Sequence, residues 1–170
     1  QIVRDSGYVG ATMPLEYGGG GAPFTTAILS GEIGIASNMA FYMGPGLSHG
    51  AMKTILKKAD DKLKETYLPK MISGEWMGTM CLTEPQCGTD LGLIKSTATP
   101  VDDHYTLNGQ KIWISFGEHD LTENIIHLVL ARLPDAPEGI KGISLFLVPK
   151  RLEDNSRNTI FCGGLEHKLG

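Results

Sequence analysis

The sequence has 170 residues, the length of one ordinary domain or of two small domains that share an interface. It carries 15 Lys and Arg against 19 Asp and Glu, a net charge of −4, which disfavours partners such as nucleic acid or an anionic membrane surface. Hydrophobic residues make up 41% and charged residues 20%, as in globular chains, and no apolar run reaches the roughly 18 residues that cross a bilayer.

The first part of the chain has helical spacing. Gly18 to Gly21 predict a loop, and apolar residues then recur every three or four positions from Phe24 onward. A second helix is expected to begin near Ser48, and a third to follow a cap at Asp60 and to stop at Pro69. Short connections between short helices predict a compact antiparallel bundle.

From Trp76 onward the apolar period changes to two, which predicts strands. Asn108 and Gly109 predict a hairpin turn, because both residues accept positive φ. Strands without helices between them predict an antiparallel barrel or sandwich, so the fold class is α+β, with domains expected at 1–78 and 79–170. The expected strands are 78–83, 95–99, 105–107, 111–115, 125–131 and 143–148.

The three cysteines, Cys81, Cys87 and Cys162, are too few for a disulfide scaffold and form no C-x-x-C pair. The plain expectation is a reduced intracellular chain, with Cys81 as a small buried side chain. No Cys or His spacing predicts a metal site.

Residues 46–50 fit the G-x-S-x-G pattern, which in serine hydrolases exposes a nucleophilic serine between a strand and a helix. Here helical sequence precedes the pattern, so Ser48 is more simply interpreted as a helix N-cap. A serine esterase that uses Ser48 stays open as the less favoured alternative.

Residues 80–90 predict a strand that runs into a loop, where Pro85 stops sheet pairing and Gly88 frees the backbone. The hydroxyls of Thr83 and Thr89 and the amides of the turn suit an anionic ligand. Further on, Trp113 and Ser115 would share one face of a strand. Together these residues predict a pocket for a planar heterocycle, and the competing interpretation of Trp113 is a core residue of a barrel.

Four blocks carry a resemblance to the acyl-CoA dehydrogenase family. They stand in matching order at 13–19 (MPLEYGG), 67–75 (YLPKMISGE), 82–90 (LTEPQCGTD) and 107–115 (LNGQKIWIS). Residues 126–133 and 142–149 are similar to the long subfamily that acts on 3-methylthiopropanoyl-CoA. The resemblance implies a helical N-terminal domain, a middle β-domain and a C-terminal helical bundle.

The resemblance also implies FAD as cofactor. Thr83 and Ser115 would hydrogen-bond the isoalloxazine ring and Trp113 would flank it, while Gly88 and Thr89 would lie along the pyrophosphate. Thr89 would also approach the CoA thioester of the substrate. The family usually has Ser at position 89 and Thr at position 115, so both hydroxyls are kept. The cofactor contacts implied are Met80, Leu82, Thr83, Gly88, Thr89, Trp113, Ile114 and Ser115.

Members of this family oxidise an acyl-CoA to the 2-enoyl-CoA, with a general-base glutamate in the C-terminal helical domain. Glu75, Glu84, Glu118 and Glu166 do not match that base, so no catalytic residue is assigned. The chain opens on Gln1 without a leader and, by the resemblance, ends inside the middle β-domain, before the domain that would carry the base. A fragment that is cut at both ends and inactive alone is therefore expected.

The resemblance implies an acyl-CoA substrate, an electron-transfer flavoprotein as acceptor and a homo-oligomeric full-length protein. The expected location is the cytoplasm or the mitochondrial matrix, with the cytoplasm preferred. Two alternatives remain beside the esterase. One is a module that binds FAD or acyl-CoA without catalysis, and the other is an acyl-CoA oxidase that passes electrons to oxygen.

Overall fold

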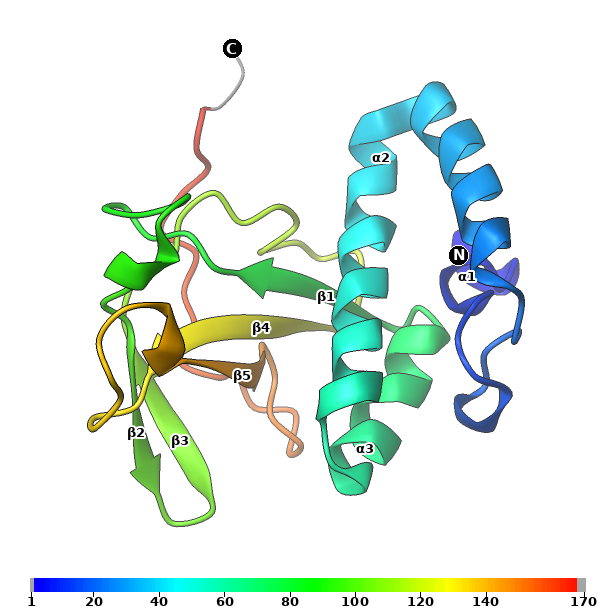
Figure 1. The fold of residues 1–170 in the computed structure, drawn as a ribbon. Coiled ribbons are helices and arrows are strands. Elements are labelled where there is room, and N and C mark those ends of the chain that lie inside the picture. Colours follow the sequence, from blue (N-terminus) through cyan, green and yellow to red (C-terminus); the bar gives the residue numbers. More distant parts are fainter. Residues whose placement is uncertain (1, 168–170) are drawn as a thin grey trace.

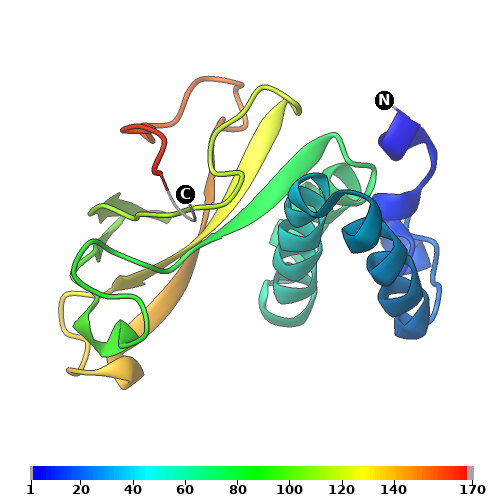
Figure 2. The ribbon, with the colours of Figure 1, turned by 90° about the horizontal axis from the view of Figure 1, so that it is seen from above.

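In the computed structural model, residues 2–167 are described, and they form a helical part followed by a sheet (Figures 1 and 2). The predicted order of helices before strands is confirmed. The helices are α1 (Ile2–Asp5), α2 (Phe24–Lys58) and α3 (Asp61–Ile72). The strands are β1 (Trp76–Cys81), β2 (Thr97–Val101), β3 (His104–Asn108), β4 (Asn124–Arg132) and β5 (Ile143–Pro149).

Helix α2 consists of two helical halves that meet at Asn38, whose φ of −161° and ψ of 90° are not helical. Figure 1 shows the bend that results. The side-chain Oδ1 of Asn38 accepts a hydrogen bond from the amide of Phe41 at 3.0 Å, so Asn38 caps the second half. The predicted start near Ser48 is therefore wrong, since Ser48 lies well inside the second half.

Helix α3 begins as predicted, because Asp60 Oδ1 accepts from the amide of Leu63 at 2.8 Å. It does not stop at Pro69 but continues to Ile72. The chain then turns at Gly74, whose φ of 76° suits glycine.

The sheet is mixed, with strand order β1-β4-β2-β3 and β5 paired to β4 as well. Strand β4 pairs parallel with β1 and antiparallel with β5. The expectation of a wholly antiparallel sheet is therefore wrong. A parallel pair needs a long crossover, and here residues 82–123 provide one that contains the β2–β3 hairpin but no α-helix.

The predicted hairpin at Asn108 and Gly109 is also wrong. Strands β2 and β3 form the hairpin instead, and the chain turns at Asp102 and Asp103. A Cβ atom on Gly109 would lie 2.1 Å from Ser96 Oγ, so this glycine serves a close approach of two segments. The predicted strand at 111–115 is absent, and its Trp113 has a φ of 58°.

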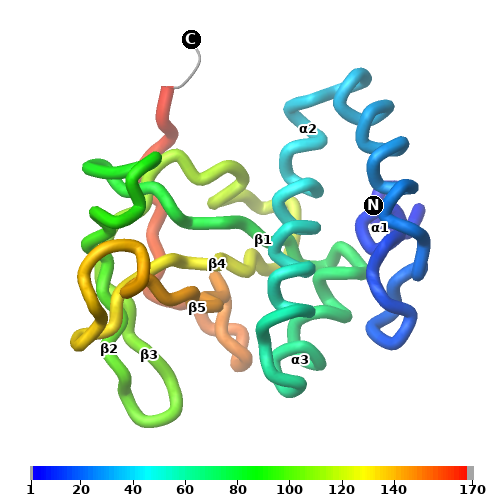
Figure 3. The backbone as a smooth tube through the Cα atoms, viewed as in Figure 1, coloured from blue at the N-terminus to red at the C-terminus, as the bar shows by residue number. Residues whose placement is uncertain are grey.

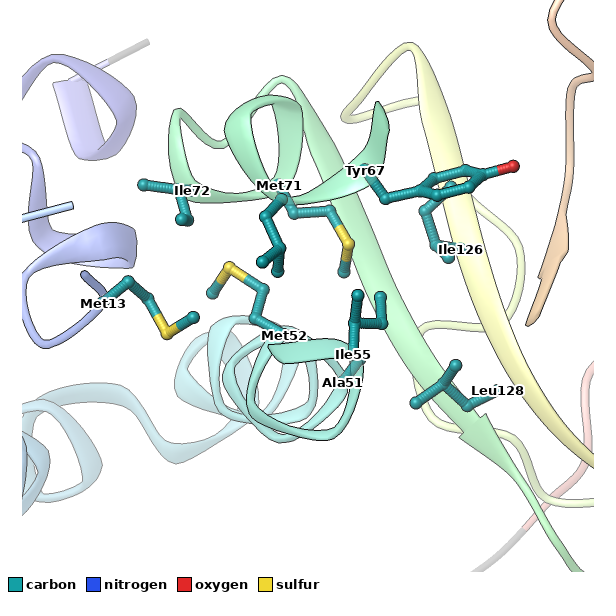
Figure 4. Packing of buried hydrophobic residues seen from close by; sticks show 10 residues of the cluster. Met13, Ala51, Met52, Ile55, Tyr67, Met71, Ile72, Ile126 and Leu128 are labelled. Atoms are coloured by element: carbon teal, nitrogen blue, oxygen red, sulfur yellow. The ribbon is translucent and has the colours of Figure 1, made fainter. Parts of the chain in front are cut away.

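The core lies between α2, α3 and the β1–β4 pair (Figure 4). Gly78 of β1 permits this packing, because a Cβ atom there would lie 2.7 Å from the Cβ of Ala51 on α2. The buried cluster consists of Met13, Ala51, Met52, Ile55, Tyr67, Leu68, Met71, Ile72, Ile126 and Leu128. Among residues 2–167 no helix is both long and apolar enough to span a membrane.

Candidate functional site

The two segments singled out in the sequence lie side by side at the outer edge of β1. The amide of Ile112 donates to the carbonyl of Thr83 at 3.0 Å, and Thr79 Oγ1 donates to the carbonyl of Ser115 at 2.9 Å. Figure 3 shows the stretch after residue 109 running along β1. We call the surface formed by residues 80–83, 88–89 and 112–115 the β1 wall. It contains every residue predicted to contact the cofactor.

The β1 wall is open to solvent in part. Trp113 is 51% exposed, and Gly88 and Thr89 are exposed, whereas Met80, Leu82, Thr83, Ile114 and Ser115 are half-buried. The left-handed backbone of Trp113 interrupts the alternation of side chains, so the argument that Trp113 and Ser115 share a strand face fails. Their proximity to Thr83 comes instead from the hydrogen bonds to β1 and its loop.

Three hydroxyls of the β1 wall are available to a ligand. Within residues 2–167, the side chains of Thr83, Thr89 and Ser115 make no hydrogen bond to the protein. Half-buried hydroxyls such as those of Thr83 and Ser115 usually find a protein or water partner. These two, together with the exposed hydroxyl of Thr89, are therefore free to bind a polar ligand on the β1 wall.

A buried carboxylate holds the loop of the β1 wall from beneath. Glu84 is 3% exposed, and its two oxygens accept from Lys111 Nζ at 2.8 Å and from Gln86 Nε2 at 2.6 Å. The amides of Lys95 and Ser96 donate to the same carboxylate at 2.7 and 3.0 Å. Glu84 thus ties its loop to the start of β2 and to the segment that carries Trp113.

The charge of Glu84 is stable because of these donors. Burial by itself raises the pKa of the carboxyl, and the hydrogen bonds from Lys111, Ser96, Lys95 and Gln86 outweigh it, lowering the pKa to about 2. A carboxylate with so low a pKa, whose oxygens already accept hydrogen bonds from these donors, does not act as a base. The structural role expected for Glu84 in the sequence agrees with this geometry.

Arg132 at the end of β4 fixes the far side of the same loop. Its guanidinium donates to the carbonyls of Ile94 at 2.9 Å, Gly92 at 2.6 Å and Pro137 at 3.1 Å. Neither Arg132 nor Lys111 is among the site residues predicted from the sequence. A signal was available in Lys111, a charged residue inside a block that otherwise reads as half-buried strand.

Cys81 is the buried member of the stretch 80–83, and its Sγ lies 3.8 Å from Nδ1 of the buried His127 on β4. Burial raises the pKa of the Cys81 thiol to about 12, which the nearby Lys111 charge only partly offsets. Burial likewise lowers the pKa of His127 to about 4. The pair is therefore a neutral part of the interior, and the prediction of Cys81 as a small buried side chain is confirmed.

Ser48 is not an exposed nucleophile. It is 1% exposed inside α2, its Oγ accepts from the amide of Gly78 at 3.0 Å, and it donates to the carbonyl of Gly44 at 3.2 Å. The neighbouring His49 pairs with Thr12 Oγ1 at 2.8 Å instead. The esterase alternative is wrong, because within residues 2–167 no strand precedes Ser48 and no base bonds to its hydroxyl.

Two of the other carboxylates considered in the sequence, Glu75 and Glu118, are engaged in ion pairs. The hydrogen bond from Lys70 lowers the pKa of Glu75. The pKa of Glu118 is lowered overall. Burial alone would raise this pKa, but the hydrogen bonds from Lys150 and Arg157 outweigh the effect of burial. None of these groups has the raised pKa that suits a general base near neutral pH.

A cavity of about 410 Å³ lies between the β2–β3 hairpin and the loop at 133–142. No residue of the β1 wall lines it. In the described part of the chain, no group of three or more His, Cys, Asp or Glu residues is placed to hold a metal ion.

Two family models match the chain. Acyl-CoA dehydrogenase, N-terminal domain, matches residues 1–75, and acyl-CoA dehydrogenase, middle domain, matches residues 79–170. The chain belongs to the acyl-CoA dehydrogenase family. A 3-methylmercaptopropionyl-CoA dehydrogenase of Ruegeria pomeroyi is 49% identical over 98% of this chain, which spans 29% of that relative. The narrower resemblance to proteins acting on 3-methylthiopropanoyl-CoA, the same acyl group under another name, is thereby confirmed.

Solved structures agree with this assignment. A structure described as the electron transferring flavoprotein of Acidaminococcus fermentans has a TM-score of 0.76 and 28% identity, over 86% of this chain and 38% of that chain. An acyl-CoA dehydrogenase complexed with FAD from Bacillus anthracis has a TM-score of 0.73 and 28% identity, over 88% of this chain and 24% of that chain.

Proposed function

We propose that this chain supplies one wall of the flavin site in an FAD-dependent acyl-CoA dehydrogenase, which oxidises an acyl-CoA thioester to the 2-enoyl-CoA. The observation that carries the proposal is the β1 wall. It presents three hydroxyls without a protein partner beside a half-exposed indole, on segments that the buried Glu84–Lys111 pair braces from beneath. Such a surface suits a flat heterocycle that stacks and hydrogen-bonds at its edge.

Each residue of the β1 wall has a role in this proposal. Thr83 and Ser115 hydrogen-bond the isoalloxazine ring and Trp113 flanks it. Gly88 and Thr89 offer backbone amides to the pyrophosphate, and the Thr89 hydroxyl also approaches the thioester of the substrate. Met80, Leu82 and Ile114 provide the half-buried apolar surface between these polar groups.

The redox chemistry would come from the cofactor, since bound FAD accepts a hydride. This chain would bind and orient the flavin and keep water from one of its faces. It would not supply the proton acceptor, because hydrogen bonds from cationic neighbours lower the pKa of Glu75, Glu84 and Glu118 and so make these carboxylates weak bases. That base belongs, in this proposal, to a part of the full-length protein outside residues 1–170.

The similar proteins support the finer points. The Bacillus anthracis structure supports FAD, and the Ruegeria pomeroyi relative supports a short 3-methylthio acyl-CoA as substrate. The similarity to the structure described as the electron transferring flavoprotein of Acidaminococcus fermentans supports an electron-transfer flavoprotein as acceptor. We also propose two domains at 1–78 and 79–170, a homo-oligomeric full-length protein and a cytoplasmic location.

The test uses the full-length protein. Purified protein should contain FAD and should reduce an artificial electron acceptor when 3-methylthiopropanoyl-CoA is added without oxygen. Peroxide formed in air at a comparable rate would instead identify an acyl-CoA oxidase. Bound FAD without turnover on any acyl-CoA would identify a non-catalytic binding module, and protein that neither contains nor takes up FAD would overturn the proposal.

A further inference from the structure

The ion pair between Glu84 and Lys111 is almost completely buried. The side chains are 3% and 11% exposed, and Lys111 Nζ lies 2.8 Å from Glu84 Oε1 and 3.1 Å from the carbonyl of Leu82. A buried ion pair often stabilises a fold no better than apolar side chains of similar size. Stability alone is therefore a weak reason for two charges at this place.

The pair joins the two segments that form the β1 wall. Glu84 directly follows Thr83, and Lys111 directly precedes Ile112, whose amide donates to the carbonyl of Thr83 at 3.0 Å. The remaining carboxylate contacts anchor Glu84 to the amides of Lys95 and Ser96 at the start of β2. One buried contact thus fixes the loop, the sheet and the Trp113 segment relative to one another.

We propose that Glu84 and Lys111 are positioning residues for the flavin, setting the separation between the hydroxyls of Thr83 and Ser115 and the indole of Trp113. This inference rests on the proposed function of the β1 wall. The two charges lie behind the wall and act through the backbone of their neighbours. Hydrogen-bonding groups fixed in advance bind a ligand more tightly than groups that must be ordered on binding.

The first experiment measures FAD affinity in the full-length protein. Lys111→Met removes the cation behind the β1 wall, and Lys150→Met is the matched control. Lys150 is also 11% exposed and ion-paired, but its partner Glu118 lies outside the wall. We expect Lys111→Met to raise the dissociation constant for FAD at least tenfold more than Lys150→Met, and to shift the visible absorption maximum of the flavin that remains bound.

A second variant guards against simple misfolding. Glu84→Gln with Lys111→Met replaces both charges by neutral side chains, so no unpaired charge is left in the interior. We expect this double variant to melt above Lys111→Met, which leaves the carboxylate of Glu84 without its cation, and still to lose FAD affinity tenfold or more. Wild-type affinity and an unchanged flavin spectrum in the double variant would overturn the proposal.

A third measurement does not depend on FAD. In FAD-free protein, we expect the Ile112 amide to exchange with solvent at least tenfold faster in the double variant, while the Gly78 amide, bonded to Ser48, stays protected. Unchanged exchange at Ile112 would overturn the positioning role. If the wild type takes up no FAD, the proposed function fails and positioning of a flavin fails with it, while Ile112 exchange still decides whether the pair holds the two segments.

Discussion

At the scale of single residues, Trp113 combines two features that seldom occur together. It is a large aromatic residue with a φ of 58°, and 51% of it is exposed. A left-handed backbone costs a non-glycine residue roughly 1–2 kcal/mol. Such strain is concentrated at functional sites, where the surrounding structure holds it in place.

Trp113→Gly removes the indole ring while keeping a residue that accepts the left-handed backbone. Glycine accepts the left-handed conformation, so we expect the melting temperature to hold or rise slightly while the affinity for FAD falls at least tenfold. The measurement is a flavin titration of the full-length protein beside its thermal unfolding. Asn155→Gly is the control, because Asn155 also has a positive φ of 63° but lies away from the β1 wall. Equal FAD affinity in the two variants would contradict a role for the indole.

Glu84 makes stability depend on acid. Its pKa is lowered from 4.5 to about 2 in the folded protein, so its contribution is complete above about pH 4.5 and is lost as the pH falls toward 2. We therefore expect the free energy of unfolding to fall between about pH 5 and pH 3 by more in the wild type than in Glu84→Gln. Chemical denaturation at both pH values measures this difference. Parallel losses in the two proteins would show that Glu84 is not responsible.

At the scale of elements, α2 and β1 meet through small residues and one buried hydroxyl. Gly78 leaves room for Ala51, and Ser48 Oγ accepts from the amide of Gly78 at 3.0 Å. This contact gives the serine of the G-x-S-x-G pattern a structural function. It also fixes the edge strand on which the β1 wall is built.

Ser48→Ala removes the acceptor for the Gly78 amide. A buried polar group left without a partner costs about 1–3 kcal/mol, and we expect that loss in the free energy of unfolding. Ser37→Ala is the control, because Ser37 Oγ donates only to the carbonyl of Ile33 on the exposed part of α2. Denaturant unfolding compares the two. Losses of the same size would argue against the Ser48–Gly78 contact as a tie between α2 and β1.

The sequence predicts the elements that depend on local patterning. Alternating apolar residues locate β4 and β5 to within a residue or so, and Asp60 marks the start of α3. Strand pairing could not be predicted, because β1 and β4 lie far apart in the chain and alternation within one strand does not indicate which strand pairs with it. The hairpin predicted at Gly109 is wrong for a related reason. A glycine is needed there because Ser96, distant in the sequence, packs too closely for a Cβ atom.

Part of the candidate site could also be predicted from the sequence. The four family blocks identify Thr83, Trp113 and Ser115 as site residues, and the structure places their segments side by side. The supporting contacts of Lys111 and Arg132 join residues far apart in the chain. The charge of Lys111 within its block indicates a buried partner, but no single-sequence pattern identifies Glu84 as that partner.

At the scale of the whole molecule, the first half of α2 presents a long apolar surface. Ile28, Leu29 and Ile33 are 58%, 65% and 68% exposed. Exposed apolar surface of this kind favours association in water. We therefore expect residues 1–170 expressed alone to self-associate. We also expect them to show no acyl-CoA turnover, because their described carboxylates lie in ion pairs or outside the β1 wall.

Light scattering and an acceptor-reduction assay check both points. Ile33→Glu should reduce the association, and Ile72→Glu, which would place a charge in the core, should unfold the chain. Turnover by residues 1–170 near that of the full-length protein would mean that the proton acceptor lies within this chain.

The proposed dehydrogenase function is tested most directly by an anaerobic titration of the FAD-loaded full-length protein with 3-methylthiopropanoyl-CoA, followed by visible absorbance. We expect the absorbance of the oxidised flavin to be lost as substrate is added and the 2-enoyl-CoA to form in equal amount. The same titration with Trp113→Gly should show weaker retention of the flavin. A flavin that stays oxidised with this and every other acyl-CoA supplied would contradict the proposed dehydrogenase function.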